Sequence, residues 1–117
     1  MMPSQFVTKV VGVTFTEDYP SNIYALAKNL AVRNESCDLV REPNNEYDAN
    51  SIRVDVHGKT IGHVPRLIAM VLAPKIDKGE NWRASVHSIV VSNENVNQPG
   101  LKIYVWRDED GNATSVS

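Results

Sequence analysis

The chain has little of several features on which common protein classes depend. Its 117 residues include one cysteine, Cys37, so no disulfide can form within the chain. We expect Cys37 to be a small buried hydrophobe, as in proteins of reducing compartments. No apolar run is long enough to span a membrane, and no signal-peptide core follows the N-terminus. These absences predict a soluble cytoplasmic protein, nucleoid-associated or, in a eukaryotic host, nuclear.

The chain also lacks an excess of positive charge. It has 12 Lys and Arg against 14 Asp and Glu, a formal net charge of −2 at pH 7. Proteins that coat nucleic acid through bulk positive charge have a strongly basic balance. Any contact with nucleic acid must therefore be local and geometric.

Signatures of catalysis and metal binding are missing as well. The three histidines, at positions 57, 63 and 87, are scattered, and no Cys or His residues have metal-ligand spacing. There is no Gly-rich phosphate loop and no Ser or Cys nucleophile motif. A nuclease-like acidic cluster of Glu42 and Asp55 near Lys59 is conceivable, but the spacing implies no general-base geometry. We expect no enzymatic activity, no metal and no cofactor.

The hydrophobic pattern predicts one mainly β domain. Apolar residues make up 42% of the chain, and a globular chain of this length buries about two-thirds of its unfolded surface. Alternating residues predict six strands, and helical spacing predicts two helices. The expected strands cover 6–15, 37–41, 52–56, 60–64, 82–92 and 101–107, and the expected helices run from 21 to about 32 and from 65 to about 76. This order favours a small, partly open six-stranded β-barrel with helices at its ends.

Side-chain faces follow from the same periodicities. Leu67, Ile68, Val71 and Leu72 are expected to dock the second helix on the sheet, and Pro74 to kink or end it. Between 82 and 92, even-numbered and odd-numbered residues should line opposite faces of one strand. We take residues 1–107 as a single domain and expect the acidic and polar tail 108–117 to be disordered.

The densest group of polar side chains lies in the loop 42–51, EPNNEYDANS, between two expected strands. Asn and Asp favour such loops because their side chains bond nearby backbone and tolerate left-handed dihedrals. One interpretation is a plain connection stiffened by Asx turns. The other is a binding loop, because Tyr47, flanked by Glu46 and Asp48, either packs onto the sheet or stands out as a stacking surface.

The run from Leu39 to Val54, LVREPNNEYDANSIRV, resembles the signature of the HIRAN domain family. Two further matches are VVG at 10–12 and IGHV at 61–64, and the resemblance covers about 6–78. It implies an OB-like barrel. In that family a pocket receives the 3′ end of single-stranded DNA.

The resemblance also implies roles for individual residues. The family's loop tyrosine stacks on the terminal base, which corresponds to Tyr47, and the adjacent aspartate accepts a hydrogen bond from the 3′-hydroxyl, which corresponds to Asp48. Asn45 would be a further polar contact, and Asn50 would hold the loop in shape. Each base stacked on an aromatic contributes about 1–3 kcal/mol.

The chain departs from the family pattern near the end of the first strand. DNA-binding members have a basic residue followed by aromatics there, whereas this chain has Thr14 followed by Phe15. The aromatic is kept and the basic residue is lost. A basic residue at the start of the second helix is retained as Arg66. We therefore expect DNA binding through Phe15, Asn45, Tyr47, Asp48 and Arg66, weaker than in the DNA-end-binding members.

These features predict a non-enzymatic module that recognises the 3′-hydroxyl end of single-stranded DNA in repair or replication-fork processing. Because the family usually appears fused to helicase or nuclease modules, such a partner would be supplied in trans. The alternative is a protein-interaction adaptor or inhibitor that keeps the barrel but has lost the DNA end.

Overall fold

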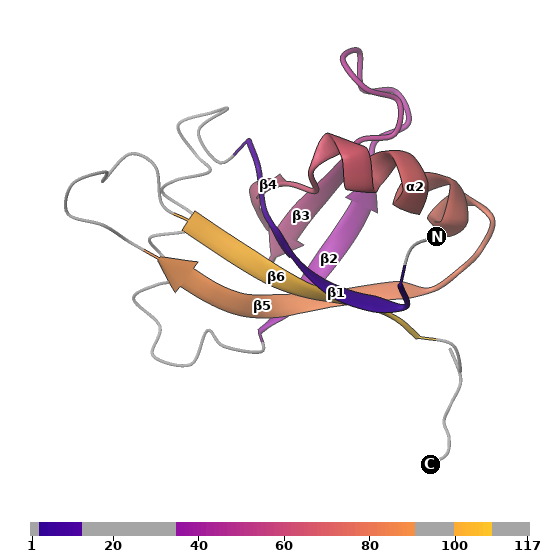
Figure 1. Ribbon diagram of the computed structural model, residues 1–117. Coiled ribbons are helices and arrows are strands. Elements are labelled where there is room, and N and C mark those ends of the chain that lie inside the picture. The colour runs from indigo at the N-terminus through magenta and orange to yellow at the C-terminus, as the bar shows by residue number, and fades with distance from the viewer. Residues whose placement is uncertain (1–2, 13–34, 91–99, 109–117) are drawn as a thin grey trace.

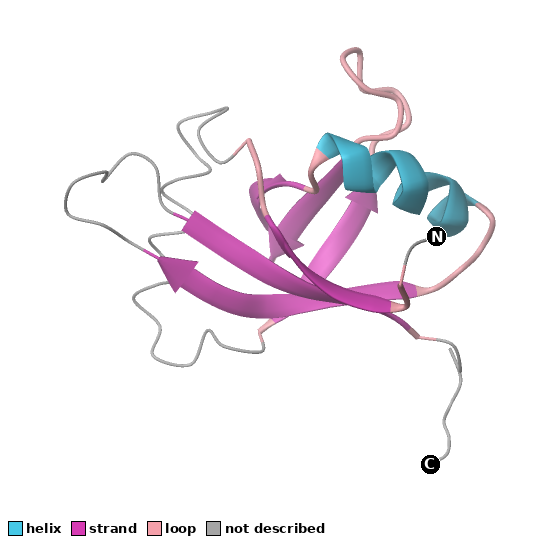
Figure 2. Ribbon diagram, viewed as in Figure 1, coloured by secondary structure: helices cyan, strands magenta, loops and turns pink. Residues whose placement is uncertain are grey.

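The computed structural model describes residues 3–12, 35–90 and 100–108. Within these ranges the chain forms six strands and one helix (Figures 1 and 2). None of the helices in the described part is long and apolar enough to cross a membrane. The expected first helix, at 21 to about 32, and Phe15 lie outside the described residues, as does nearly all of the tail.

The strands form one antiparallel sheet with the order β1-β6-β5-β2-β3-β4. Their bounds are β1 Gln5–Lys9, β2 Ser36–Arg41, β3 Ile52–Val56, β4 Lys59–His63, β5 Trp82–Val90 and β6 Gly100–Arg107. The sheet curls into a half-barrel (Figure 1), with β1 at one edge beside β6 and β4 at the other edge. The expected mainly β, barrel-like fold is thus confirmed in its strands.

A tight turn joins β3 to β4. Its two residues, His57 and Gly58, both have positive φ, at 53° and 77°. Two-residue hairpin turns favour such dihedrals because their twist matches that of the flanking strands. The predicted hairpin at this place is confirmed.

The segment that follows edge strand β1 meets the other edge strand, β4, where Val11 pairs with His63. The backbone N–H of each residue donates to the carbonyl of the other, both at 2.8 Å. Because the edges are bridged here, part of the backbone hydrogen-bonding capacity that an open sheet leaves exposed is satisfied. The half-barrel is therefore closed at this end.

Helix α2, Arg66–Asp77, packs against the inner face of the sheet. Its residues Ala69, Leu72 and Ala73 are buried with the inward residues of the strands. The largest side chains of this core are Ile52, Ile61, Leu72 and Ile103. The helix continues three residues past Pro74 and ends where Gly79, at φ 102°, takes a left-handed conformation.

Two predictions about side-chain faces are wrong. Leu67 is 75% exposed and Val71 is also exposed, so neither docks the helix as expected. Together with Met70 they form an outward apolar strip, because small alanines at 69 and 73 let the helix lie close to the sheet on another side.

The regular alternation predicted for β5 is also wrong beyond Val86. A register shift lies between Val86 and Ser88, so that Ser88 pairs with Lys102 and Ile89 pairs with Leu101. An extra residue in a strand reverses the faces that follow it. Ile89 accordingly packs against the core, the side opposite to the expected one.

Cys37 is buried, as expected. Burial, with smaller contributions from the carboxylates of Asp38 and Glu35, raises the pKa of its thiol to about 12. The thiol therefore stays protonated at neutral pH and is a poor nucleophile.

The contrast between the two leucines of α2 yields a stability prediction. Leu72→Ala should lower the free energy of unfolding by roughly 2–5 kcal/mol, because it opens a cavity in the core. Leu67→Ala should change it by no more than about 0.5 kcal/mol, because the side chain is already exposed. Urea denaturation followed by tryptophan fluorescence measures both, and equal losses would contradict this placement of the helix.

Candidate nucleic-acid interface

The loop 42–51 continues the ladder between β2 and β3 and then folds on itself. The backbone N–H of Glu42 donates to the backbone carbonyl of Ser51 at 3.0 Å, and this bond closes the base of the loop. Farther out, the N–H of Asn45 donates to the carbonyl of Glu42 and that of Ser51 to the carbonyl of Asp48, both at 3.0 Å. The loop is therefore a compact unit, visible as the projection beyond α2 in Figure 2.

Two Asx-type turns shape the tip of the loop. Asn45 Oδ1 accepts hydrogen bonds from the backbone N–H of Tyr47 at 2.8 Å and of Asp48 at 3.1 Å. Asp48 Oδ1 accepts one from the backbone N–H of Asn50 at 2.9 Å. The interpretation of the loop as one stiffened by Asx turns thus describes its construction, and the expected ligand contact of Asn45 stays a prediction.

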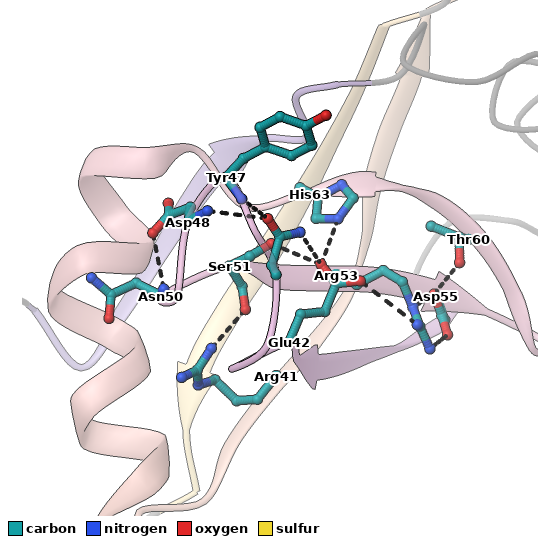
Figure 3. A network of polar contacts seen from close by, with 11 residues as sticks. Arg41, Glu42, Tyr47, Asp48, Asn50, Ser51, Arg53, Asp55, Thr60 and His63 are labelled. Atoms are coloured by element: carbon teal, nitrogen blue, oxygen red, sulfur yellow. Dashed lines mark hydrogen bonds and ion pairs between the residues drawn. The ribbon is translucent and has the colours of Figure 1, made fainter.

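The carboxylate of Glu42 is the centre of the network beneath the loop (Figure 3). Its Oε1 accepts a hydrogen bond from the Ser51 hydroxyl at 2.8 Å and lies 2.9 Å from Nε2 of His63 on β4. The amide of Asn45 donates to the same oxygen at 3.4 Å, and the guanidinium of Arg53 lies 3.8 Å from Oε2. One side chain thereby connects both ends of the loop to two strands.

These contacts change the acidity of Glu42. Partial burial by itself would raise the pKa of the carboxyl, but the hydrogen bonds from Ser51 and His63 outweigh it, and the pKa is lowered overall. The ionised form is the one that accepts these hydrogen bonds. The network is therefore complete at neutral pH.

Arg41 attaches the loop to the helix. Its Nη1 and Nη2 donate to the carbonyls of Ser51 at 2.8 Å and Ala49 at 3.0 Å. Its Nε and Nη2 also reach the two carboxylate oxygens of Asp77, at the end of α2, at 2.9 and 3.1 Å. Sequence reasoning missed this role, because nothing in the spacing of positions 41 and 77 indicates that they meet.

The structure brings three of the predicted site residues together. Asp48 Oδ2 lies 3.9 Å from Nε of Arg66, at the start of α2. Tyr47, the neighbour of Asp48, is 76% exposed, and its ring points away from the network (Figure 3). Of the two orientations considered for Tyr47, the structure has the outward one.

The surface around these residues combines three chemical properties. It offers an aromatic face, a carboxylate oxygen that can accept a hydrogen bond, and an exposed guanidinium that can pair with an anion. Asp55, which was considered for a nuclease-like cluster, accepts hydrogen bonds from Arg53 at 2.9 Å and Thr60 at 2.7 Å. Among residues 3–12, 35–90 and 100–108, no group of three or more His, Cys, Asp or Glu could hold a metal ion.

Comparisons with known proteins show the family of the chain. The family model of the HIRAN domain matches residues 4–106. A SWI/SNF-related matrix-associated actin-dependent regulator of chromatin subfamily A member 3-like 1 from Arabidopsis thaliana is 37% identical over 89 residues, 68% of this chain and 9% of the relative. A helicase-like transcription factor from Mus musculus is 45% identical over 58 residues, 49% of this chain and 6% of the relative. The chain thus spans less than a tenth of the length of these relatives.

Solved structures share the fold. A crystal structure of a Lactobacillus plantarum protein superposes with a TM-score of 0.63 at 22% identity, covering 88% of this chain and 96% of the other. The HIRAN domain of human HLTF superposes with a TM-score of 0.58 at 24% identity, covering 92% of this chain and 79% of the other.

The Glu42 network predicts a pH dependence of stability. Because the pKa of Glu42 is lowered in the folded state, its contribution is fully present above the unfolded pKa, about 4.3, and is lost as the pH falls through the folded value. Glu42→Gln should destabilise the fold at pH 7 by roughly 1–2 kcal/mol, since hydrogen bonds to a charged group become neutral ones.

The measurement is urea denaturation of the wild type and Glu42→Gln at pH 7, 5, 4 and 3. The difference in the free energy of unfolding between the wild type and Glu42→Gln, called the stability gap here, should stay constant from pH 7 to about 5 and shrink below about 4. Glu46→Gln, in the same loop but exposed, is the matched control and should show almost no gap. A gap for Glu42→Gln that is independent of pH would contradict the charged network.

Proposed function

We propose that this chain, which belongs to the HIRAN domain family, is a non-enzymatic DNA-binding module that takes the 3′-hydroxyl end of a single strand at Tyr47, Asp48 and Arg66. The observation that carries the proposal is the exposed ring of Tyr47 on a loop whose backbone is held by hydrogen bonds and supported by the Glu42 network. A loop backbone that is already held loses less conformational entropy when a base binds.

Asp48 is suited to a terminal hydroxyl. Its Oδ1 is occupied by the N–H of Asn50, whereas Oδ2 faces Arg66 at 3.9 Å, beyond hydrogen-bonding distance. An ionised carboxylate only accepts hydrogen bonds. Oδ2 can therefore accept one from a 3′-hydroxyl and would repel a 3′-phosphate.

Arg66 supplies the positive charge that an acidic chain otherwise lacks at this place. Its side chain is 82% exposed, so its five donors can turn toward a phosphate of the bound nucleotide. Phe15, which the resemblance places in the same pocket, lies outside the described residues. The module would act where 3′ ends are exposed, as in DNA repair and at stalled forks, together with a helicase or nuclease.

A protein-interaction adaptor is the second candidate. It is favoured by the outward apolar side chains of Leu67, Met70 and Val71 on α2. In that case the barrel would be kept and oligonucleotides would not bind.

The stacking role of Tyr47 can be tested directly. Tyr47→Ala should weaken binding of a short single-stranded DNA by roughly 1–3 kcal/mol, which is the contribution of one stacked base. Because the ring is exposed, the melting temperature should not change. Tyr47→Phe keeps the ring and should bind normally. Unchanged DNA affinity of Tyr47→Ala in a fluorescence anisotropy titration would exclude the stacking role.

End recognition is tested by competition among three oligonucleotides of one sequence, with a 3′-hydroxyl, a 3′-phosphate or a circular form. The wild type should prefer the 3′-hydroxyl by about tenfold to a hundredfold, because a hydrogen bond to a charged group contributes roughly 1.5–3 kcal/mol. Asp48→Asn should narrow this preference. The asparagine oxygen can still accept from the N–H of Asn50, so the loop keeps its shape.

Glu46→Gln, which removes a neighbouring exposed charge, should leave the preference unchanged. Equal affinity of the wild type for all three oligonucleotides would refute end recognition. Failure to bind any of them would favour the adaptor.

A further inference from the structure

Two lysines face each other on the outer side of the half-barrel. Lys9 of β1 pairs in register with Lys102 of β6, and both are exposed. The next pair along, Val10 and Leu101, is joined by an N–H to carbonyl bond of 2.9 Å. Antiparallel pairs alternate between hydrogen-bonded and non-hydrogen-bonded types, so the lysines form the closer, non-hydrogen-bonded kind, with Cα atoms about 4.5 Å apart.

This pairing has no internal compensation in the described part of the chain. Like charges placed directly opposite on neighbouring strands destabilise a sheet. Neither ammonium forms an ion pair with a described carboxylate. Two adjacent cations without a partner among the described residues are a natural contact for an anion supplied from outside.

Aromatic side chains lie next to the lysines on the same face. Because residues alternate along β6, Lys102, Tyr104 and Trp106 all point outward. The rings of Tyr104 and Trp106 stack with their centroids 5.3 Å apart and their planes at 24°. The Tyr104 hydroxyl donates to Gln5 of β1 at 2.8 Å, which holds the ring in place. Cations beside fixed aromatic rings are the combination that binds phosphates and bases of single strands.

The backbone bridge between Val11 and His63 links the lysine pair to the strand beneath the Tyr47 loop. Val11 lies two residues beyond Lys9, just past the end of β1, and is exposed. Its partner across the closure is His63, whose side chain contacts Glu42 beneath the loop. A strand whose end lies at Tyr47 could therefore continue past His63 and Val11 to the two lysines.

We propose that Lys9 and Lys102, with Tyr104 and Trp106 beside them, bind single-stranded nucleic acid behind its terminal nucleotide. The two ammonium groups take backbone phosphates, and the ring pair provides the apolar surface for a base. This proposal rests on the proposed function, because it assigns the path of the strand whose end that site holds. An acidic peptide would need the lysines but would have no use for the adjoining rings.

The test compares a DNA trinucleotide, which only reaches the end site, with a 15-nucleotide strand of the same 3′ sequence. The variant K9Q/K102Q should bind the trinucleotide as the wild type does and the 15-nucleotide strand about tenfold more weakly at 0.1 M salt. The slope of log affinity against log salt should fall by about 1.4 for the longer strand, at roughly 0.7 per phosphate contact. The melting temperature of K9Q/K102Q should equal or exceed that of the wild type, because the repulsion between the two lysines is removed.

The variant K59Q/K78Q is the matched control, since it removes two exposed lysines elsewhere. If K9Q/K102Q weakens the 15-nucleotide strand no more than this control does, the lysine path is refuted, even where Tyr47→Ala still weakens the trinucleotide. If Tyr47→Ala leaves the trinucleotide unaffected, the end site itself fails, and the two failures are thereby distinguished. Equal competition by an oligoglutamate of the same charge would overturn the nucleic-acid assignment in favour of an acidic protein segment.

Discussion

The position of His63 is the constraint on which both the barrel and the loop depend. Its backbone exchanges two hydrogen bonds with Val11 and so joins the edge strand β4 to the segment that follows β1. Its side chain lies 2.9 Å from the carboxylate of Glu42, which in turn holds Ser51 and Asn45. His63 therefore takes part both in closing the sheet, through its backbone, and in supporting the loop, through its side chain. A change of sheet curvature at this place would move the loop as well.

This coupling bears on the proposed recognition of nucleic acid, because the chain has no excess of positive charge. With a net charge of −2, attraction to nucleic acid cannot come from the field of the whole molecule. The proposed binding therefore depends on individual cations. Arg66, which lies 3.9 Å from Asp48, is one of them, and the other place is the pair Lys9 and Lys102, with Lys102 two residues before Tyr104 on β6.

Most of the other described cations near the loop are engaged within the fold. Arg41 is bonded to Asp77 and to two loop carbonyls, and Arg53 is bonded to Asp55. Partly buried ionic contacts of this kind stabilise one conformation of the loop over others more than they attract a ligand. Arg41 and Arg53 therefore stabilise the loop, whereas Arg66, Lys9 and Lys102 are the cations assigned to the proposed binding.

The sequence by itself determined the strands, the hairpin turn, the second helix and the family, because these depend on local periodicity, turn chemistry and a continuous motif. It also predicted a site at Tyr47, Asp48 and Arg66, and the structure places Asp48 3.9 Å from Arg66. Only the tertiary structure decided that Tyr47 points outward, that Arg41 reaches Asp77, and that Leu67 faces away from the sheet. It alone also revealed the shift after Val86 and the pairing of Lys9 with Lys102. The physical reason is that these features depend on the register and curvature of strands far apart in the chain, which no local pattern records.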